Sequence, residues 1–528
     1  MSARTVGSAF SASMSTFKKL AGDTALYGIS TIFGRMLNFV LVPLQTYVFP
    51  RPGELASNVE LYSYVAVLLT IYTLGLETAF FRFAARNKSQ NSAERQSVFN
   101  DTLSLVLVVT GVFTVTIILL TPQLSVWLNY PGQQTFIIWA ALIVAIDAIV
   151  AIPFARLRVE NKPRQFVRAK IISIVLVVAL NVFFLIVCRD IYAGKYLTAL
   201  QPFIRLFYNP AIGPGYIFLA NLLGNAAYFI LLRDAFRGYR FRIDRTQVGV
   251  LVAYAFPIML TGLAGVINNM TDRTFLRHYL PEGFYAGLTS ADALGIYGNC
   301  YKLSVFMALA IQSFKFAADP FFFSQAEDKN APELLARVTK WFLIVCLFIW
   351  VGVSLNLDII GLLVSKRYRS GLDIVPLLLL ANLFLGVYYN LAFWFKLSDK
   401  TSFGTLITVV GAVITVVGNI LLIPRLGYMG CAVAFLTSSF VMMALCYVLG
   451  EKYYPVPYDL RSAAGYVVGS GLLIWASFQF PIANLWVAVP VHLALFGLFT
   501  AVVLLIERDT LRPLLRSRGR SPKIVSPR

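Results

Sequence analysis

The chain has 528 residues, of which 58% are hydrophobic and 13% are charged. Soluble domains average about 45–50% apolar and about 25% charged residues, so this composition excludes soluble enzymes, disordered scaffolds and secreted disulfide modules. The formal net charge is +20, which in a membrane protein indicates contact with an anionic leaflet or an anionic substrate. Five cysteines without CxxC spacing and only two histidines indicate neither a metal site nor a disulfide framework.

Fourteen segments are candidate membrane spans, because a helix that crosses the bilayer core needs about 20 mostly apolar residues. Residues 462–506 contain no charged residue, and Pro481 with Asn484 divides this stretch into two spans. Charged residues make the spans at 248–271 and 293–316 the least regular. The sequence therefore predicts an all-α polytopic membrane protein. Its predicted helices are 24–48, 61–83, 101–121, 134–155, 169–188, 214–233, 248–271, 293–316, 339–357, 372–395, 402–424, 428–449, 462–479 and 485–506.

Most of the 45 Lys and Arg residues fall on the side of the membrane that also holds both chain ends. Because cytoplasmic segments carry the excess of Lys and Arg, both termini are predicted to be cytoplasmic. The basic tail 508–528 then faces anionic phospholipid, and no nucleic-acid partner is expected. The longest loop, around residues 190–213, faces outward and is too short for a catalytic domain. We therefore expect the function to lie within the helices and the protein not to be an enzyme.

An internal repeat divides the chain into two halves. Residues 81–85 (FRFAA) recur as 314–318 (FKFAA), and the pairs Lys162/Asn181 and Lys400/Asn419 have equal spacing. Six spans per half is an even number, so the halves have the same orientation and are related by a pseudo-twofold axis along the membrane normal. The predicted organisation is a tail (1–20), an N-lobe (21–246), a C-lobe (247–450), a helical hairpin (451–507) and a basic tail (508–528).

Four ordered motifs carry a resemblance to a known family. They are residues 27–35 (YGISTIFGR), 75–83 (GLETAFFRF), 268–276 (NNMTDRTFL) and 419–427 (NILLIPRLG). In this order they resemble a Wzx-type polysaccharide flippase of the multidrug/oligosaccharidyl-lipid/polysaccharide exporter superfamily. The resemblance implies two six-helix lobes around a cavity, with extra C-terminal helices.

The resemblance also implies the function. The substrate would be an oligosaccharide on a polyprenyl pyrophosphate, turned from the cytoplasmic to the outer leaflet of the bacterial plasma membrane for surface polysaccharide or lipopolysaccharide biosynthesis. A polysaccharide polymerase and glycosyltransferases are the implied partners. No cofactor is expected beyond a coupling proton or sodium ion.

Charged residues inside the predicted spans are the candidate site, because a charge at mid-bilayer costs about 2.5–3.5 kcal/mol and normally faces a cavity or a partner. Five are basic, and a basic surplus suits a pyrophosphate. Arg35, mid-span, is the leading candidate, with a structural salt bridge to Glu77 or Asp147 as the alternative. The proposed substrate-binding residues are Arg35, Arg273, Lys302, Arg82 and Lys315.

Three of the other basic candidates also have a structural reading. Arg273 stands beside Asp272 and is either a cavity residue or one half of an ion pair. Arg82 and Lys315 occupy equivalent positions near the inner face, where snorkelling explains them as well as a pyrophosphate does.

Three acidic residues, Glu77, Asp147 and Asp272, are candidates for ion coupling. Asp147 has a structural alternative, as a partner of Arg156 or Arg35. Pro257 interrupts the backbone hydrogen-bond ladder of its span and, with Gly262, is a candidate hinge. Plain packing accommodation is the alternative.

Three competing functions remain at this level. A multidrug extruder of the same superfamily would favour an acidic and aromatic lining, against the basic surplus observed. A polytopic ligase or acyltransferase needs catalytic groups, and His278 alone near the outer face is a weak candidate. A non-transporting scaffold explains the topology but leaves the charges within the spans without a role.

Overall fold

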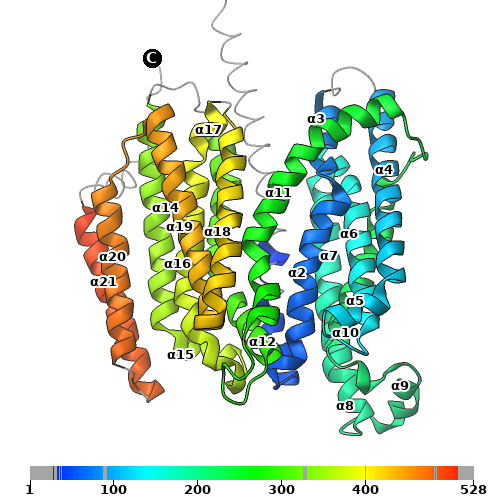
Figure 1. The fold of residues 1–528 in the computed structure, drawn as a ribbon, viewed down its shortest axis with the longest axis horizontal. Helices are drawn as coiled ribbons and strands as arrows, with labels where there is room; N and C mark the ends of the chain where they lie inside the picture. Colours follow the sequence, from blue (N-terminus) through cyan, green and yellow to red (C-terminus); the bar gives the residue numbers. More distant parts are fainter. Residues whose placement is uncertain are drawn as a thin grey trace, which may run out of the picture.

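The computed structural model of the chain is helical, with no β-strand in the part that it describes. Two bundles of helices stand side by side, and one long helix, α11 (Arg245–Tyr279), passes between them (Figure 1). The described residues are 28, 32–34, 36, 39–86, 92–324, 330–398, 400–480, 482 and 484–508.

The N-terminal bundle comprises the first helix and every described element through α10. These elements are the first helix (Ile32–Val48), η1 (Pro52–Leu55), α2 (Ala56–Thr73), α3 (Leu76–Arg86), α4 (Ser92–Leu119), α5 (Thr121–Trp127), α6 (Gln134–Val159), α7 (Pro163–Val182), η3 (Phe183–Cys188), α8 (Arg189–Tyr192), η4 (Thr198–Leu200), α9 (Gln201–Phe207), η5 (Pro210–Ile212) and α10 (Gly215–Leu231). The predicted outward loop thus contains the two short helices α8 and α9.

The C-terminal bundle follows α11. Its elements are α12 (Ser290–Tyr301), η7 (Lys302–Ser304), α13 (Val305–Ser324), α14 (Ala331–Leu355), α15 (Leu357–Ile360), η8 (Gly361–Leu363), η9 (Lys366–Ile374), α16 (Val375–Leu391), α17 (Phe393–Leu397), α18 (Ser402–Leu426) and α19 (Tyr428–Tyr453). A hairpin of α20 (Leu460–Gln479) and α21 (Leu485–Ile506) is attached to the outside of this bundle (Figure 1).

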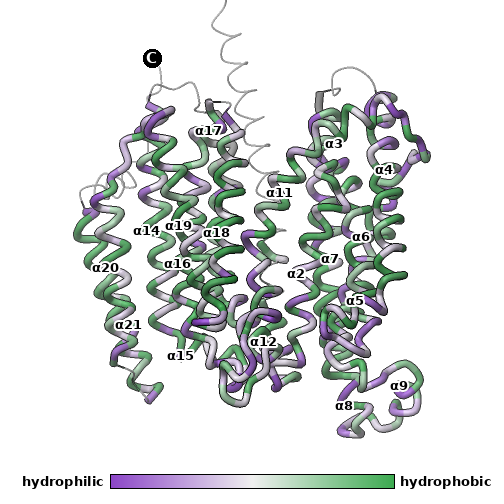
Figure 2. Tube along the Cα trace, in the orientation of Figure 1, coloured by the Kyte–Doolittle hydropathy of each residue, from purple (hydrophilic) through white to green (hydrophobic). Residues whose placement is uncertain are grey.

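Eleven of the described helices are long and apolar enough to cross a membrane. They include the two least regular predictions, which become Arg245–Tyr279 and Ser290–Lys315. The first helix and α10 are apolar but shorter, and α20 lies at the predicted position without being among the eleven. Figure 2 shows hydrophobic residues along most of the helices. The all-α polytopic prediction is confirmed.

Two ends of the molecule are distinguished below. The terminal end holds α3, the start of α4 and the C-terminal side of α21 (Figure 1). The distal end holds η1, α8, α9 and α12. If both chain ends are cytoplasmic, the distal end faces outward.

A matching hydrogen bond fastens the last two helices of each bundle. In the N-terminal bundle the Ser173 hydroxyl on α7 donates to the Gly224 carbonyl on α10, at 2.9 Å. In the C-terminal bundle the serine is on the later helix and the glycine on the earlier one: the Ser438 hydroxyl on α19 donates to the Gly411 carbonyl on α18, at 2.8 Å. At both glycines a Cβ atom would collide with the facing side chain, so glycine permits the close approach.

The asparagine pair of the repeat occupies equivalent sites in the two bundles. Asn181 on α7 and Asn419 on α18 are both fully buried. Each donates its side-chain amide to the carbonyl four residues earlier, at 2.8 Å, and each leaves its Oδ1 atom without a hydrogen-bond partner. The sequence echo therefore corresponds to a repeated local structure.

Polar contacts at both ends attach the α20–α21 hairpin to the C-terminal bundle. At the terminal end the buried Glu507 carboxylate lies 2.6 Å from Lys340 of α14 and accepts a 2.7 Å hydrogen bond from Tyr466 of α20. At the distal end His492 of α21 lies 3.7 Å from Asp358 of α15. The hairpin is therefore held to the outer side of α14 rather than placed between the two bundles.

Candidate functional site

The helix α11 belongs to both bundles. Leu251 and Ala255, in its terminal half, lie in the hydrophobic core of the N-terminal bundle. Leu276 and the following Leu280 lie in the core of the C-terminal bundle. The change from one core to the other occurs around Pro257, the proline inside this helix.

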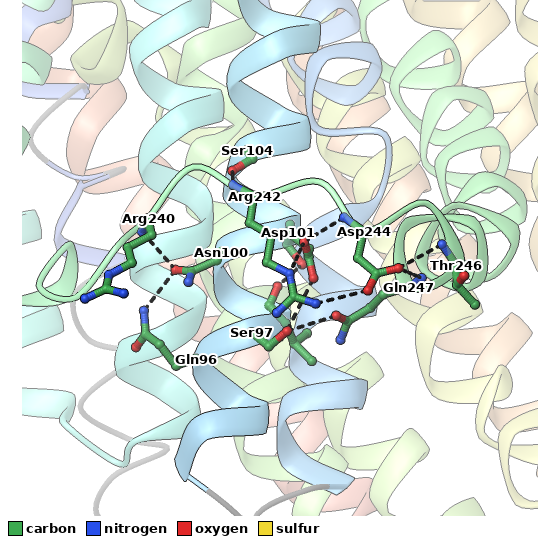
Figure 3. Close-up of polar contacts among 12 residues, drawn as sticks. Gln96, Ser97, Asn100, Asp101, Ser104, Arg240, Arg242, Asp244, Thr246 and Gln247 are labelled. Atoms are coloured by element: carbon green, nitrogen blue, oxygen red, sulfur yellow. Dashed lines mark hydrogen bonds and ion pairs between the residues drawn. The ribbon is translucent and has the colours of Figure 1, made fainter.

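A network of hydrogen bonds, here called the clamp, ties the segment before α11 to α4 (Figure 3). Asn100 accepts the backbone N–H of Arg240 at 3.3 Å, and Ser104 accepts that of Arg242 at 3.0 Å. The fully buried Asp101 carboxylate accepts the N–H of Asp244 at 3.0 Å. The linker therefore lies fixed across the terminal end of the N-terminal bundle.

The clamp also sets the start of α11. The Asp244 side chain caps the helix by accepting the backbone N–H groups of Thr246 at 3.0 Å and Gln247 at 3.3 Å. Hydrogen bonds from Gln247 and Arg242 lower the pKa of the Asp244 carboxyl. The cap is therefore ionised at neutral pH, which favours the positive end of the helix dipole.

Beyond Pro257, α11 is bonded to α18 and α19. The hydroxyl groups of Thr261 and Thr405 lie 3.1 Å apart. The buried Asn268 accepts a hydrogen bond from Thr415 of α18, and Ser438 of α19 lies 2.8 Å from the same Asn268 oxygen. The distal half of α11 is thus hydrogen-bonded to the C-terminal bundle.

The predicted cation Arg273 lies near the distal end of α11 and is neutralised. Its guanidinium lies 3.2 Å from the Asp272 carboxylate, and both residues are buried. Tyr297 donates a hydrogen bond to the other oxygen of the same carboxylate. The guanidinium carbon also lies 4.5 Å from the centre of the Tyr301 ring. Of the two readings of this residue, the ion pair is the one observed.

Lys302 lies at the contact between the two bundles, and its hydrogen-bond partners in the described part of the chain are amides. Its ammonium donates to Gln45 of the first helix at 3.3 Å and to Asn299 of α12 at 3.2 Å. Within the described residues, no carboxylate lies within salt-bridge distance of it. Asp272, Arg273 and Lys302 together carry two positive charges and one negative charge, so this part of the interface has a surplus of one positive charge.

The two bundles are joined directly at the distal end. Among the described residues, every hydrogen bond between a residue before 244 and a residue after 280 uses a residue between 45 and 53. The pairs are Gln45–Lys302, Thr46–Ser365, Tyr47–Leu362, Phe49–Tyr368 and Gly53–Asp292. At Gly295 of α12 a Cβ atom would stand 1.9 Å from the Pro52 carbonyl oxygen, so backbone meets backbone at this point.

Two other predicted residues, Glu77 and Arg82, lie at the terminal end with partners of their own. Glu77 pairs with Arg158 of α6. The Arg82 guanidinium lies 4.4 Å from the centre of the Tyr254 ring of α11. These contacts stay within the N-terminal bundle and the terminal half of α11.

Lys315, the counterpart of Arg82 in the C-terminal bundle, also lies over an aromatic ring. Its ammonium is 4.0 Å from the centre of the Tyr389 ring of α16. The two residues therefore share a cation–π environment, which is compatible with snorkelling cations.

Of the two predicted partners of Asp147, Arg156 is wrong. Asp147 of α6 accepts a 2.9 Å hydrogen bond from Asn225 of α10. Arg156 instead bonds Glu160 at 2.7 Å, because the two residues are one helical turn apart.

The predicted residue Arg35 lies outside the described residues. Pro257 and Gly262 both lie within the continuous helix α11.

A basic pocket lies at the terminal end of the N-terminal bundle, away from the interface between the bundles. It has a volume of about 390 Å³, and its polar lining includes Arg95, Arg156, Glu160 and Lys162. Burial alone would raise the pKa of the Glu160 carboxyl, but hydrogen bonds from Lys162 and Arg156 outweigh it and lower that pKa. Glu160 therefore compensates one of the three positive charges in this pocket.

Glu60 is one of the buried carboxylates, with Asp101 and Glu507, that the sequence analysis did not identify. Glu60 of α2 has a fully buried side chain at the distal end. It stands one residue before the predicted start of the second span, so it was read as a loop residue. The polar run of residues 51–60, followed by a helical apolar stretch, was the only signal that could have indicated it.

No protein-family model and no curated protein matches the sequence, but solved structures match the fold. The lipid II flippase MurJ, in an inward closed conformation, matches with a TM-score of 0.65 and 14% identity, over 92% of this chain and 100% of that one. An inward-facing structure of a multidrug resistance MATE family transporter of the MOP superfamily matches with a TM-score of 0.57 and 13% identity, over 80% and 94%. An outward-facing structure of a multidrug resistance MATE family transporter of the MOP superfamily matches with a TM-score of 0.53 and 13% identity, over 82% of this chain and 95% of that one. The chain has the fold of these membrane transporters.

Proposed function

We propose that the protein is a membrane transporter that works by alternating access and flips an oligosaccharide linked to a polyprenyl pyrophosphate. The shared fold with a lipid II flippase and with MATE transporters supports the transporter class. The lipid-linked substrate rests on the charge at the interface between the bundles, and that charge is the single observation that carries the proposal.

Lys302 supplies that charge. Among the described predicted cations it alone lies at a direct contact between the two bundles, and its ammonium is bonded only to neutral amides. An ammonium group binds phosphate as a point charge, and in a partly desolvated site such a contact is stronger than in water. The paired Arg273 stands beside it and adds a second donor group once Asp272 is displaced. A pyrophosphate would find here a positive charge that no carboxylate cancels.

The conformational cycle follows from the contacts of α11. With the distal end joined by hydrogen bonds, the substrate would enter from the terminal end, which is cytoplasmic in the proposed orientation. Opening the distal end requires the bundles to separate there, while each keeps its own half of α11. The bending must then occur between Pro257 and Gly262, where α11 passes from one core to the other.

Ion coupling remains a part of the proposal. Asp147 is the best placed of the three acidic candidates, because its described hydrogen-bond partner is the neutral Asn225. Glu77 and Asp272 are each paired with an arginine. The proposed location is the bacterial inner membrane, with anionic phospholipid around the basic tail and with a polymerase and glycosyltransferases acting before and after the flipping step.

The test is the flipping of a fluorescent polyprenyl-pyrophosphate oligosaccharide by purified protein in proteoliposomes. We expect Lys302→Gln to reduce the rate about 10-fold to 100-fold, because a hydrogen bond to a charged group contributes about 1.5–3 kcal/mol. Lys366→Gln is the matched control, since Lys366 is exposed at the same end of the molecule.

Each alternative function predicts a different outcome. Full activity of the Lys302→Gln variant would remove Lys302 from the mechanism. Proton- or sodium-driven uptake of organic cations by the parent protein, with no flipping, would replace the proposal with a multidrug extruder. Transfer of a glycan or acyl group by the purified protein would indicate an enzyme.

A further inference from the structure

Glu60 is a buried carboxylate at the contact between α2 and α11. Its side chain is fully buried. The Tyr130 hydroxyl donates to Oε2 at 2.6 Å, and the Tyr64 hydroxyl donates to Oε1 at 2.9 Å. The imidazole Nε2 atom of His278 lies 3.1 Å from the same Oε1. Four side chains therefore meet at this point, and three of them surround the carboxylate.

These groups come from both sides of the interface. Tyr64 belongs to α2, Tyr130 precedes α6 in the N-terminal bundle, and His278 ends the half of α11 that packs on the C-terminal bundle. One further cation is near: Arg277 lies 5.5 Å from the centre of the Tyr130 ring and donates to Ser290 at 2.6 Å. Within the described residues no Lys or Arg is within salt-bridge distance of Glu60.

A buried carboxylate is stable only if it is neutral or compensated, because an unpaired buried charge costs far more than a buried hydrogen bond. The two tyrosines supply hydrogen bonds but no charge. His278 is the one basic side chain among the described residues in contact with Glu60, and 28% of its side chain is exposed. Together they are neutral only when they share one proton, which lies on the imidazole or on the carboxylate.

We propose that Glu60 and His278 form a proton-binding site that holds α11 against α2 and so keeps the distal end closed. The proton enters through the exposed part of His278, from the solution at the distal end. With one proton bound, the buried pair is neutral and the contact is stable. The proposal concerns the opening of the distal end, so it holds whatever the substrate is.

The direction of the pH effect follows from the charge. As the pH rises and the proton leaves, Glu60 becomes a buried anion with no cationic partner, and the contact between α2 and α11 weakens. Closure of the distal end is therefore expected to fall as the pH is raised.

The test uses two cysteine pairs, each of which joins α11 to a neighbouring helix. The Ser63 and Thr274 hydroxyl groups lie 3.4 Å apart across the α2–α11 contact. Ser63→Cys with Thr274→Cys therefore reports distal closure through disulfide formation with an added oxidant. Thr261→Cys with Thr405→Cys is the matched control, because this pair is 3.1 Å apart and lies on the side that α11 shares with the C-terminal bundle. The native cysteines in the described residues are buried, which limits background reaction.

We expect the initial crosslinking rate of the distal pair, divided by that of the control pair, to fall severalfold between about pH 6 and pH 8. The experiment is done without substrate, so its result is independent of the flipping assay. In Glu60→Gln no buried anion forms when the proton leaves, so the ratio should not fall as the pH is raised. In His278→Gln the carboxylate loses the imidazole, and the ratio should be low and nearly constant.

A constant ratio in the parent protein would overturn the proposal. So would a pH response that persists in either variant, because it would assign the titration to another group. If one variant does not fold, the other decides, since each removes a different member of the pair.

Discussion

The two ends of this molecule differ in what holds α11 and its neighbours together. At the distal end, residues 45–53 bridge the bundles directly, and Glu60 with His278 adds a contact between α2 and α11. At the terminal end, the clamp at Asp101 and Asp244 holds α11 to the N-terminal bundle alone. In the described residues, the hydrogen bonds that join the bundles directly all lie at the distal end.

This difference shows where movement is possible. A conformational change that separates the bundles must break contacts at the distal end but none of the clamp at the terminal end. It must also deform α11, because Leu251 lies in one core and Leu276 in the other. Packed cores change between discrete arrangements rather than deforming smoothly, so the deformation is concentrated where no core holds the helix.

The largest effect is expected from Gly295→Ala. Its Cβ atom would meet the backbone oxygen of Pro52, which cannot move aside like a side chain. Overpacking of this kind costs about 1–3 kcal/mol, so the distal end should open or the protein should lose stability. Labelling of a cysteine at the buried Ser57 by an impermeant maleimide measures the opening. Gly469→Ala is the control, with no atom within 4 Å of the new Cβ; unchanged labelling in Gly295→Ala would show that the distal closure is not tight.

The clamp should be broken by Asp101→Ala. This change removes the acceptor for the Asp244 N–H group, and an unsatisfied buried donor costs about 1–3 kcal/mol. Faster cleavage by trypsin after Arg240 or Arg242 is the expected result. Ser97→Ala, which removes only a 3.1 Å contact to Gln247 and a 3.5 Å contact to Asp101, should have a smaller effect. Equal cleavage of all three proteins would mean that the linker is held by other contacts.

The hinge between the two ends is tested by Gly262→Ala. The new Cβ would lie 3.5 Å from Thr70, an ordinary contact, so the fold tolerates it. Alanine favours the helix by about 1 kcal/mol over glycine, which should slow transport up to about fivefold without loss of stability. Gly249→Ala has the same propensity change in the clamped part of α11, with no neighbour within 4 Å. Equal transport rates in the two variants would place the bending elsewhere.

The smallest effect is expected for the response of the terminal end to a change of pH. Hydrogen bonds from Gln247 and Arg242 lower the pKa of Asp244, so the stability that its cap contributes is present above the unfolded pKa of about 3.9. It is lost only when the pH falls through the still lower folded value. Tryptic cleavage of the linker, relative to an unstructured peptide, should therefore be constant between about pH 6 and pH 8. A change that parallels distal crosslinking would show that both ends respond to one common transition.

Much of the charged site could be placed from sequence, but its pairing could not. Lys302 and Arg273 were identified because charges are rare in apolar spans. That Arg273 is neutralised and Lys302 is not depends on which way each side chain leaves its helix and on Tyr297, Gln45 and Asn299. Asp147 shows the same limit, since its partner Asn225 lies 78 positions away on another helix.

The sequence by itself determined the helical membrane class, the approximate place of most spans and the repeat, because hydrophobicity and local spacing are properties of contiguous residues. The predicted second span 61–83 is the exception, since it is interrupted between α2, which ends at Thr73, and α3, which begins at Leu76. Tertiary structure alone decided that α11 divides its length between two cores and that Glu60 is buried against His278. Glu60 and His278 are 218 positions apart in the sequence, so no local sequence pattern could indicate that they are in contact. The closure of the distal end is likewise a property of contacts between bundles, which exist only after both have folded.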